Sequence, residues 1–330
     1  VWTKTFGGSE DDRVFSVQQT TDSGYIITGY TQSYGNGNYD GWLLKVMESN
    51  IWHVATTGSD ATGDGTEENP FATIQTGINA TVDGDTVLVA AGTYTENINY
   101  NGKNIVVESE SGAASTTIIP ANTGVTIVWF HNSETRNAKL IGFTLQNGGN
   151  FRGGGINIGG SSPTIENCII ANCAGDAVKS WDASPKFVNC LIYGTSGRTI
   201  YFDTNTATPE IINCTFVNNA QYGLRNDMSY TPVVKNCIVY GNISGGAYGN
   251  LDITYSLIEG GFSGTGNITS DPLFCNPDSS DYTLAENSPC VGMGEGGANM
   301  GAFDVGCDSL ILAPVILDIA FDQQIYEDDS

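Results

Sequence analysis

The feature that most constrains this chain is an Asn-Cys dipeptide that recurs at intervals of 22, 24 and 23 residues. Its four copies are Asn167-Cys168, Asn189-Cys190, Asn213-Cys214 and Asn236-Cys237. Each copy lies between two short strand-like stretches, as in PTIENCII and VVKNCIV, and a turn rich in Gly and Asn follows. A unit of this size cannot bury its own apolar face, so the repeat predicts a solenoid of stacked rungs. The unit has no helical period, which disfavours leucine-rich and helical repeats.

Stacking places equivalent residues of neighbouring rungs about 4.8 Å apart, the spacing of paired strands. We expect two apolar columns inside the solenoid, the first of Ile165, Val188, Ile212 and Val234 and the second of Ile170, Ile192, Phe216 and Val239. Asn tolerates a left-handed backbone, and its amide can bond to the next Asn in a stack. The Asn row is therefore interpreted as a structural ladder, with a polar ligand site as the alternative.

Composition agrees with an all-β chain and excludes two classes of partner. The sequence has 36 Asp and Glu against 12 Lys and Arg, so the formal charge is 12 − 36 = −24, and double-stranded nucleic acid is not an expected partner. Only 15% of residues are charged and 42 are Gly, which favours β-structure over disorder. The longest apolar run has eight residues, Leu310–Leu317, far below the roughly 18 that a membrane span requires.

Three stretches carry a resemblance to a known superfamily. They are WHVATTGSDATGDGTEENPFATIQTGI, GDTVLVAAGTYTENI and the closing DPLF, DYTL, SPC and GAF. Together they resemble the right-handed parallel β-helix (pectate-lyase-like) superfamily, especially secreted bacterial β-helix proteins, over roughly residues 51–307. The resemblance implies a fold and an extracellular or cell-surface location. It leaves activity open, because such domains include lyases, hydrolases, epimerases, adhesins and proteins without catalysis.

We expect three segments along the chain. Residues 50–309 form the β-helix, with Phe71, Ile74 and Ile78 on a short amphipathic helix that caps its open end. Residues 1–49 look like one blade-sized unit of a β-propeller-type repeat with four short strands. Residues 310–330 read as a strand that begins a truncated β-domain. The opening VWTKTFGG has no signal-peptide features, so a secretion signal is expected to lie upstream or to have been removed.

The eight cysteines divide into two groups. Five fall inside the solenoid (Cys168, Cys173, Cys190, Cys214 and Cys237), where small thiols pack as ordinary hydrophobes and a reduced ladder is expected. The other three (Cys275, Cys290 and Cys307) lie in the loop-rich tail, where a disulfide is expected. Cys290–Cys307 and Cys275–Cys290 are the candidate pairings, and the sequence does not choose between connectivities. His53 and His131 are isolated in sequence, so no zinc site is expected.

Strand alternation predicts which side chains point outward from one face of the solenoid. The stretches GGINIGG, DAVKSWD, RTIYFDT, YGLRNDM and GAYGN place Ile156, Val178, Ile200, Leu224 and Ala247 inward. The next column points outward and contains Asn157, Lys179, Tyr201, Arg225 and Tyr248. A second outward column contains Gly159, Trp181, Asp203 and Asp227. Aromatic faces stack on sugar C–H surfaces and the polar groups bond hydroxyls, so this face is a candidate polysaccharide site.

The same residues support two catalytic hypotheses. A lyase would use Lys179 or Arg225 as the base, with Ca²⁺ held by Asp182, Asp203 or Asp227 to neutralise a uronate. A hydrolase would use Asp203 and Asp227 as the acid and the base or nucleophile. Asn157, Trp181, Tyr201 and Tyr248 would bind the substrate in either case. Lys179 and Arg225 could also neutralise the two carboxylates without metal, which leaves an ordinary polar exterior.

The alternative function belongs to a different class. A structural surface protein or adhesin would self-associate into an assembly or filament through exposed β edges at residues 1–49 and 310–321. The sequence thus predicts a polysaccharide or surface glycan, or a second copy of the chain, as the partner, with no nucleic acid and no membrane insertion. Calcium is the one cofactor considered.

Overall fold

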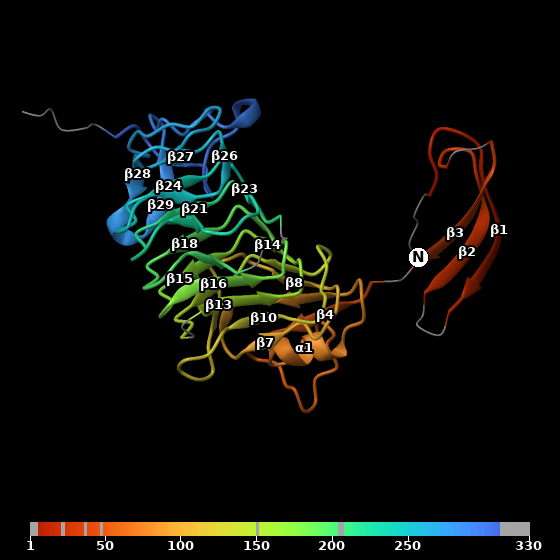
Figure 1. Ribbon diagram of the computed structural model, residues 1–330. Helices are drawn as coiled ribbons and strands as arrows, with labels where there is room; N and C mark the ends of the chain where they lie inside the picture. The colour runs from red at the N-terminus through yellow and green to blue at the C-terminus, as the bar shows by residue number, and fades with distance from the viewer. Residues whose placement is uncertain are drawn as a thin grey trace, which may run out of the picture.

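The chain folds into a parallel β-solenoid, as Figure 1 shows, with the rungs stacked from the orange end at α1 to the blue strands near residue 307. The computed structural model describes residues 6–20, 24–35, 38–46, 49–149, 152–203 and 208–310. Three parallel sheets form the walls of the solenoid, because each rung contributes one short strand to each wall. The predicted all-β fold class is confirmed.

The walls differ in length. The nine-stranded sheet contains β4 (Ile51–Val54), β5 (Thr86–Val89), β8 (Val106–Ser109), β11 (Lys139–Ile141), β14 (Thr164–Glu166), β17 (Lys186–Val188), β20 (Glu210–Ile212), β23 (Val233–Lys235) and β26 (Asp252–Thr254). The eight-stranded sheet contains β6 (Gly92–Thr95), β9 (Thr116–Ile119), β12 (Thr144–Gln146), β15 (Ile169–Ala171), β18 (Leu191–Tyr193), β21 (Thr215–Val217), β24 (Ile238–Tyr240) and β27 (Leu257–Ile258). The five-stranded sheet contains β7 (Ile98–Asn99), β10 (Val128–Phe130), β13 (Arg152–Gly159), β16 (Asp176–Trp181) and β19 (Ile200–Phe202), and a separate parallel pair, β22 (Leu224–Asn226) and β25 (Ala247–Gly249), follows it.

The repeated asparagines form the corner between β14 and β15 and its equivalents in the next rungs. All four have a left-handed backbone, with φ of 52° at Asn167, 51° at Asn189, 50° at Asn213 and 54° at Asn236. The Asn189 side-chain amide donates to the Oδ1 of Asn167 at 3.1 Å. Asn is one of the few residues that tolerates this conformation without strain. The predicted left-handed Asn corner is confirmed in all four copies, and the predicted side-chain ladder is present in one step, from Asn189 to Asn167.

One of the two expected apolar columns is correct and the other is wrong at two positions. Ile170, Ile192, Phe216 and Val239 pair in register and are buried, as expected. In the other column Ile165 pairs with Phe187, which pairs with Ile211, and both partners are fully buried. Val188 and Ile212 are therefore one residue out of register and point outward, because a shift of one residue moves a side chain to the opposite face of a strand.

The cysteines of the repeat pack inside the solenoid as free thiols. Cys168, Cys173, Cys190, Cys214 and Cys237 are all buried and unpaired, which confirms the expected ladder. The backbone N–H of Cys190 donates to the Sγ of Cys214 at 3.4 Å, and Cys214 does the same to Cys237. The thiols of Cys214 and Cys237 thus each accept a hydrogen bond from the preceding rung while they fill the core.

A short helix closes the N-terminal end, as the sequence predicts. Helix α1 (Ile74–Ala80) packs against β4, β5 and β7, with Ile74 and Ile78 fully buried. Phe71, expected on the same helix, precedes it and instead forms an isolated bridge with Val54, with its side chain buried. The carboxylate of Glu96 accepts hydrogen bonds from the N–H groups of Ile74 and Gln75, both at 2.9 Å. At the other end of α1 the Lys103 ammonium donates to three backbone carbonyls, including that of Ile78 at 2.7 Å. A carboxylate at the first turn and a cation at the last complement the helix dipole.

The C-terminal region folds back over the outer side of the eight-stranded sheet. It contains β28 (Phe274–Asn276), η1 (Pro277–Ser279), β29 (Asp281–Ala285), η2 (Glu295–Gly297) and β30 (Val305–Cys307). Its buried side chains form a second apolar core with outward residues of the solenoid. The N–H of Glu295 donates to the Oδ1 of Asn236 at 2.8 Å, and the N–H of Gly301 donates to the Asn236 carbonyl at 2.7 Å.

The tail holds a disulfide, as expected, but neither of the pairings considered is correct. The bond joins Cys275 to Cys307, with the two Cα atoms 5.9 Å apart, while Cys290 is a buried free thiol. Cys275 lies on β28 and Cys307 on β30, and both strands pair with β29. The order of the strands in this sheet brings Cys275 and Cys307 together, and the spacing of the cysteines in the sequence does not predict that order. The strand predicted over 310–321 falls, after residue 310, outside the described residues.

Residues 6–46 form a small antiparallel sheet (red in Figure 1). Its strands are β1 (Asp12–Gln19), β2 (Tyr25–Thr31) and β3 (Asp40–Val46), in the order β1, β2, β3. Three of the four expected strands are present in the described part of this segment, and residues 1–5 lie outside it. The propeller-type assignment of this unit stays a prediction.

Candidate functional site

The first outward column predicted from strand alternation is present in two separate parts, Asn157 to Tyr201 and Arg225 to Tyr248, and it begins two rungs earlier than expected, with Asn99 on β7. Of the second column, only Gly159 and Trp181 are paired. Trp129 on β10 pairs with Asn157 on β13, Asn157 with Lys179 on β16, and Lys179 with Tyr201 on β19. Arg225 pairs with Tyr248 in the separate pair β22 and β25. The inward residues between them are buried, except Ala247, which is half-buried. We call the solvent-facing side of these seven strands the outer face.

Trp181 lies flat on this face. Its Cα partner on the neighbouring strand is Gly159. A Cβ added to Gly159 would lie 2.3 Å from the Cε2 and Cζ2 atoms of the indole, so the ring rests directly on the glycine backbone. Trp181 is nevertheless 36% exposed. The indole is thus packed against the sheet on the side of Gly159, while about a third of the side chain stays exposed.

We call the indole of Trp181, together with the Gly159 backbone beneath it, the platform. His131, which looks isolated in the sequence, lies at its edge. Its Nε2 is 2.9 Å from the Oδ1 of Asn157. Its ring is edge-on to Trp129, with centroids 4.8 Å apart, and edge-on to Trp181 at 6.1 Å. The alternating stretch Val128–Asn132 could have identified Trp129 and His131, because it continues the outward pattern one rung before GGINIGG.

Lys179 and Asp203 form an ion pair beside the platform. The Lys179 ammonium lies 4.0 Å from the Oδ2 of Asp203 and 5.7 Å from the centroid of Trp181. Both charged side chains are partly exposed. Two of the residues predicted as catalytic are therefore in contact with each other, and they flank the exposed aromatic surface.

A second group of aromatic and cationic residues lies further along the solenoid. The Arg225 guanidinium is 5.7 Å from the ring of Tyr222 and 5.5 Å from that of Tyr248, and it bonds Asp227 at 2.8 Å. Tyr222 and Tyr248 have ring centroids 5.5 Å apart. The sequence predicted Arg225, Asp227 and Tyr248 here, and it missed Tyr222 because this residue precedes the strand.

Near Tyr201, a further arginine that the sequence analysis missed stacks on the outward column. The Arg198 guanidinium carbon lies 4.5 Å from the centroid of the Tyr201 ring. The backbone N–H of Arg198 donates to the Oδ1 of Asp176 at 2.7 Å, which fixes the turn before β19.

The acidic residues are not gathered as a calcium site would require. Asp203 and Asp227 each contact a cation, and the sheet ladder is interrupted between β19 and β22, so the two carboxylates do not occupy paired positions of one sheet. Asp182 lies in the turn after β16 with a left-handed φ of 48°. Within the described ranges no group of three His, Cys, Asp or Glu side chains is placed to hold a metal ion. The residues present therefore do not fit a preformed calcium site.

One buried phenol lies close to this region. Tyr230 is 8% exposed and its ring is edge-on to Phe202 at 6.2 Å. Its hydroxyl has no hydrogen-bond partner among the residues that the structure describes. Burial, and then the negative charge of Asp203, raises the pKa of Tyr230 above the usual tyrosine value. The group is therefore a neutral phenol near neutral pH.

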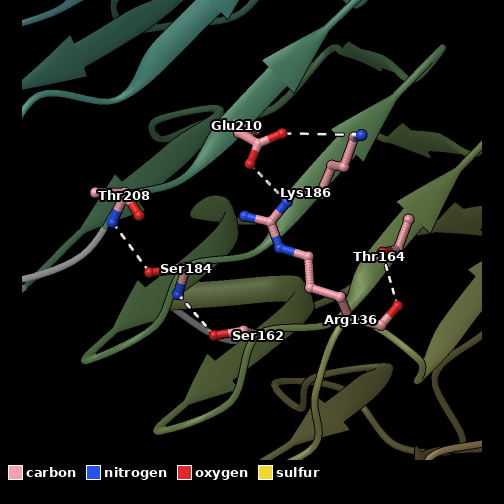
Figure 2. A network of polar contacts seen from close by, with 7 residues as sticks. All are labelled: Arg136, Ser162, Thr164, Ser184, Lys186, Thr208 and Glu210. Carbon is pink, nitrogen blue, oxygen red and sulfur yellow. Dashed lines mark hydrogen bonds and ion pairs between the residues drawn. The ribbon is translucent and has the colours of Figure 1, made fainter. Parts of the chain in front are cut away.

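A polar network fixes the turns that follow the outer-face strands (Figure 2). The N–H of Ser184 donates to the Ser162 hydroxyl at 3.1 Å, and the N–H of Thr208 donates to the Ser184 hydroxyl at 3.0 Å. Arg136 reaches across these rungs to Glu210 at 2.7 Å. Lys186 lies 3.8 Å from the same carboxylate, as Figure 2 shows. Because Ser184 follows Trp181 by three residues, this network holds the end of β16 in register.

Comparisons with known proteins agree with the fold. The family described as "Right handed beta helix region" matches residues 125–254, less than half of the chain. No curated protein matches the sequence significantly. Similar solved structures include pectate lyase Pel9A, which is 14% identical with a TM-score of 0.41 and is covered over 97% of its length by 78% of this chain. A rhamnogalacturonan lyase is 13% identical with a TM-score of 0.36, and 81% of this chain covers 64% of it. These likenesses are too distant to transfer a substrate.

Within the described residues, no helix has the length and apolar character needed to cross a membrane.

Proposed function

We propose that this is a secreted or cell-surface β-helix protein that binds polysaccharide along the outer face. The observation that carries the proposal is Trp181, whose indole is pressed against Gly159 while about a third of the side chain stays exposed. Removing a large exposed aromatic surface from water is worth about 2 kcal/mol. A ligand that covers the indole would therefore gain about this much binding free energy. Sugar rings present C–H faces of matching shape.

The groups around the indole supply the polar half of such a site. His131, bonded to the largely buried Asn157, and the Lys179–Asp203 pair both lie near the indole. Together they offer both donors and acceptors for hydroxyl groups, the pattern expected where an apolar platform fixes a sugar and a few polar groups orient it. Tyr201, Tyr222 and Tyr248 continue the surface along the solenoid axis, at one rung per roughly 4.8 Å.

Degradation of the bound polysaccharide is the catalytic extension of this proposal. In the lyase form, Lys179 would abstract the proton next to a uronate carboxylate, and Arg225 is the other candidate base. In the hydrolase form, Asp203 and Asp227 would act as acid and base or nucleophile. A glycan panel followed by absorbance of the unsaturated product, or by reducing-sugar release, distinguishes a lyase, a hydrolase and a binder without activity.

Binding is tested by affinity electrophoresis and calorimetry on a panel of neutral and acidic polysaccharides, with Trp181→Ala as the main variant. We expect loss of binding with an unchanged melting temperature. Tyr34→Ala is the matched control, since Tyr34 is 60% exposed but lies in the N-terminal segment. Binding by wild type that Trp181→Ala leaves intact would show that the outer face is not the site. Adding Ca²⁺ or EDTA to each titration tests the calcium hypothesis separately.

Self-association remains the second candidate function, and one observation favours it. The small sheet exposes large apolar side chains, with Phe15 at 72% and Leu43 at 71%. Isolated sheets of three strands gain stability when such residues meet a partner surface. Light scattering of wild type and Phe15→Ser/Leu43→Ser tests this directly. A higher oligomer that dissociates in the variant would support assembly, and a monomer in both would exclude this surface.

A further inference from the structure

Among the arginines of the outer face whose side chains the structure describes, Arg198 has no carboxylate partner. Arg198 stacks on Tyr201 at 4.5 Å, and no carboxylate of the described residues lies within ion-pair distance of its guanidinium. The other arginines with described side chains are all paired, Arg13 with Asp11, Arg136 with Glu210 and Arg225 with Asp227. In a chain with 36 acidic residues and 12 basic ones, an arginine without an acidic partner is unexpected.

The position of Arg198 relative to the platform is fixed by the sheet register. Tyr201 pairs with Lys179, and Lys179 lies two residues before Trp181 on the same strand. Tyr201, which carries the Arg198 guanidinium, is therefore offset from Trp181 by one rung, about 4.8 Å, and by two residues, about 7 Å, along the strand. A glycan longer than one sugar that stacks on the indole and runs obliquely across the strands can contact Trp181 and Arg198 together.

The other two cations of the outer face with described side chains, Lys179 and Arg225, each have a carboxylate partner, and Arg198 differs from them in this respect. Asp203 neutralises Lys179, and Asp227 neutralises Arg225. The stack on Tyr201 holds the guanidinium plane in place by cation–π attraction and leaves its N–H donors for another acceptor. Guanidinium groups bind carboxylate and sulfate oxygens through two parallel hydrogen bonds. A net charge of −24 repels anionic ligands at long range, so selection for one requires such a local cation.

We propose that Arg198 is the specificity-determining residue of the outer face and binds an anionic substituent, a carboxylate or a sulfate ester, of a glycan that stacks on Trp181. This inference rests on the proposed function and adds the charge of the ligand. It assigns selectivity for acidic over neutral glycans to one side chain, separate from the platform that binds both.

The test compares oligosaccharides that differ only in the acidic group. A uronate oligomer, its carboxyl-reduced neutral counterpart and a sulfated derivative of the neutral oligomer are titrated by calorimetry against wild type and Arg198→Gln. We expect the variant to lose roughly 10- to 100-fold in affinity for the preferred acidic probe, the usual value of a charge-assisted bidentate contact, and to bind the neutral probe as wild type does. The acidic probe that wild type prefers identifies carboxylate or sulfate as the substituent.

Lys139→Gln is the matched control. Lys139 is a half-buried cation on the nine-stranded sheet, so the control removes the same charge from a different face. Equal losses in Arg198→Gln and Lys139→Gln would reduce the effect to net charge and overturn the proposal. Arg198→Lys should recover only part of the affinity, because an ammonium keeps the charge without the planar fork.

The remaining outcomes separate this inference from the proposed function. If wild type binds neutral and acidic probes equally and Arg198→Gln changes neither, the inference fails and the proposed function stands. If wild type binds none of the three probes, the inference on Arg198 and the proposed function both fail for these ligands. Trp181→Ala should weaken the neutral and acidic probes alike, which Arg198→Gln should not. Melting curves confirm that the variants fold, since the backbone contact of residue 198 with Asp176 does not depend on its side chain.

Discussion

Trp181 rests on Gly159 of the preceding rung so closely that no side chain other than hydrogen fits beneath the indole. Gly159 has an ordinary backbone φ, so conformational freedom does not explain the glycine. The close approach of the ring does. The glycine is thus part of the candidate site although it offers no functional group.

Replacing Gly159 by Ala should therefore weaken glycan binding nearly as much as Trp181→Ala does. The added Cβ would collide with the indole at 2.3 Å and push the ring away from the sheet. Calorimetry gives the affinity, and a red shift of tryptophan fluorescence reports the displaced ring. Gly41→Ala is the control, because a Cβ there meets nothing within 4 Å. Unchanged affinity in Gly159→Ala would show that the flat position of Trp181 is not needed.

Placing a carboxylate at Ile200 should unfold the solenoid. Ile200 is 1% exposed and pairs with Val178 in the inward column. An unpaired buried charge costs several kcal/mol, which is a large part of the roughly 5–15 kcal/mol that stabilises a folded domain. Thermal and urea unfolding measure the effect. Ile243→Asp, at a residue that is 83% exposed, should leave the transition where it is in wild type.

The free thiols should be unreactive in the folded protein. Burial raises the pKa of Cys173 to about 11 and that of Cys290 to about 12, so almost no thiolate forms near neutral pH. Mass spectrometry after iodoacetamide treatment should show no label on the native protein and six labels in denaturant without reductant. Adding reductant to the denatured protein should raise the number by the two cysteines of the Cys275–Cys307 bond. Rapid labelling of the native protein would contradict the buried ladder.

The N-terminal sheet should lose stability in strong acid through Asp12. A hydrogen bond from the Thr31 hydroxyl, followed by one from the Gly8 N–H, lowers the pKa of Asp12 from 3.8 to about 2. Because the folded state holds the proton less tightly than the unfolded state, this contribution is complete above pH 3.8 and is lost as the pH falls through about 2. Amide NMR of β1 and β2 between about pH 5 and about pH 2, on both sides of the usual Asp pKa, follows the loss. Asp12→Asn should flatten this dependence.

The repeat predicted most of the solenoid, and its failures have physical causes. Asn at a fixed interval locates a left-handed corner, which fixes the register of strands on both sides, so the outward positions of Lys179, Trp181 and Tyr201 followed directly. The apolar character of Val188 predicts an inward side chain, whereas its position directly before Asn189 places it outward. An outward valine is common on a strand exterior, so hydrophobicity alone cannot reveal a one-residue slip.

The candidate site was predicted less completely because its parts are not periodic. His131 and Trp129 belong to a rung without the Asn-Cys signal, and Arg198 and Tyr222 lie in turns, where strand alternation gives no direction. The Cys275–Cys307 pairing and the ion pairs of Asp203 and Asp227 depend on which strands are neighbours. Such contacts depend on which strands become neighbours in three dimensions, and this cannot be inferred from a single sequence.

Neighbouring rungs of a solenoid make similar contacts with one another, so these contacts alone do not determine how many rungs the solenoid has. Here the C-terminal region removes that freedom, because it takes both the side-chain oxygen and the carbonyl of Asn236. The Oδ1 of Asn213, one rung below, is left buried without a donor. The C-terminal region also contacts Thr215, Asn218 and Tyr193 on the two preceding rungs. Inserting a rung within or after this stretch would separate some of these contacts by about 4.8 Å, whereas a rung duplicated before β17 would leave all of them intact. The protein can therefore change length by repeat duplication only on the side of β17 that faces α1.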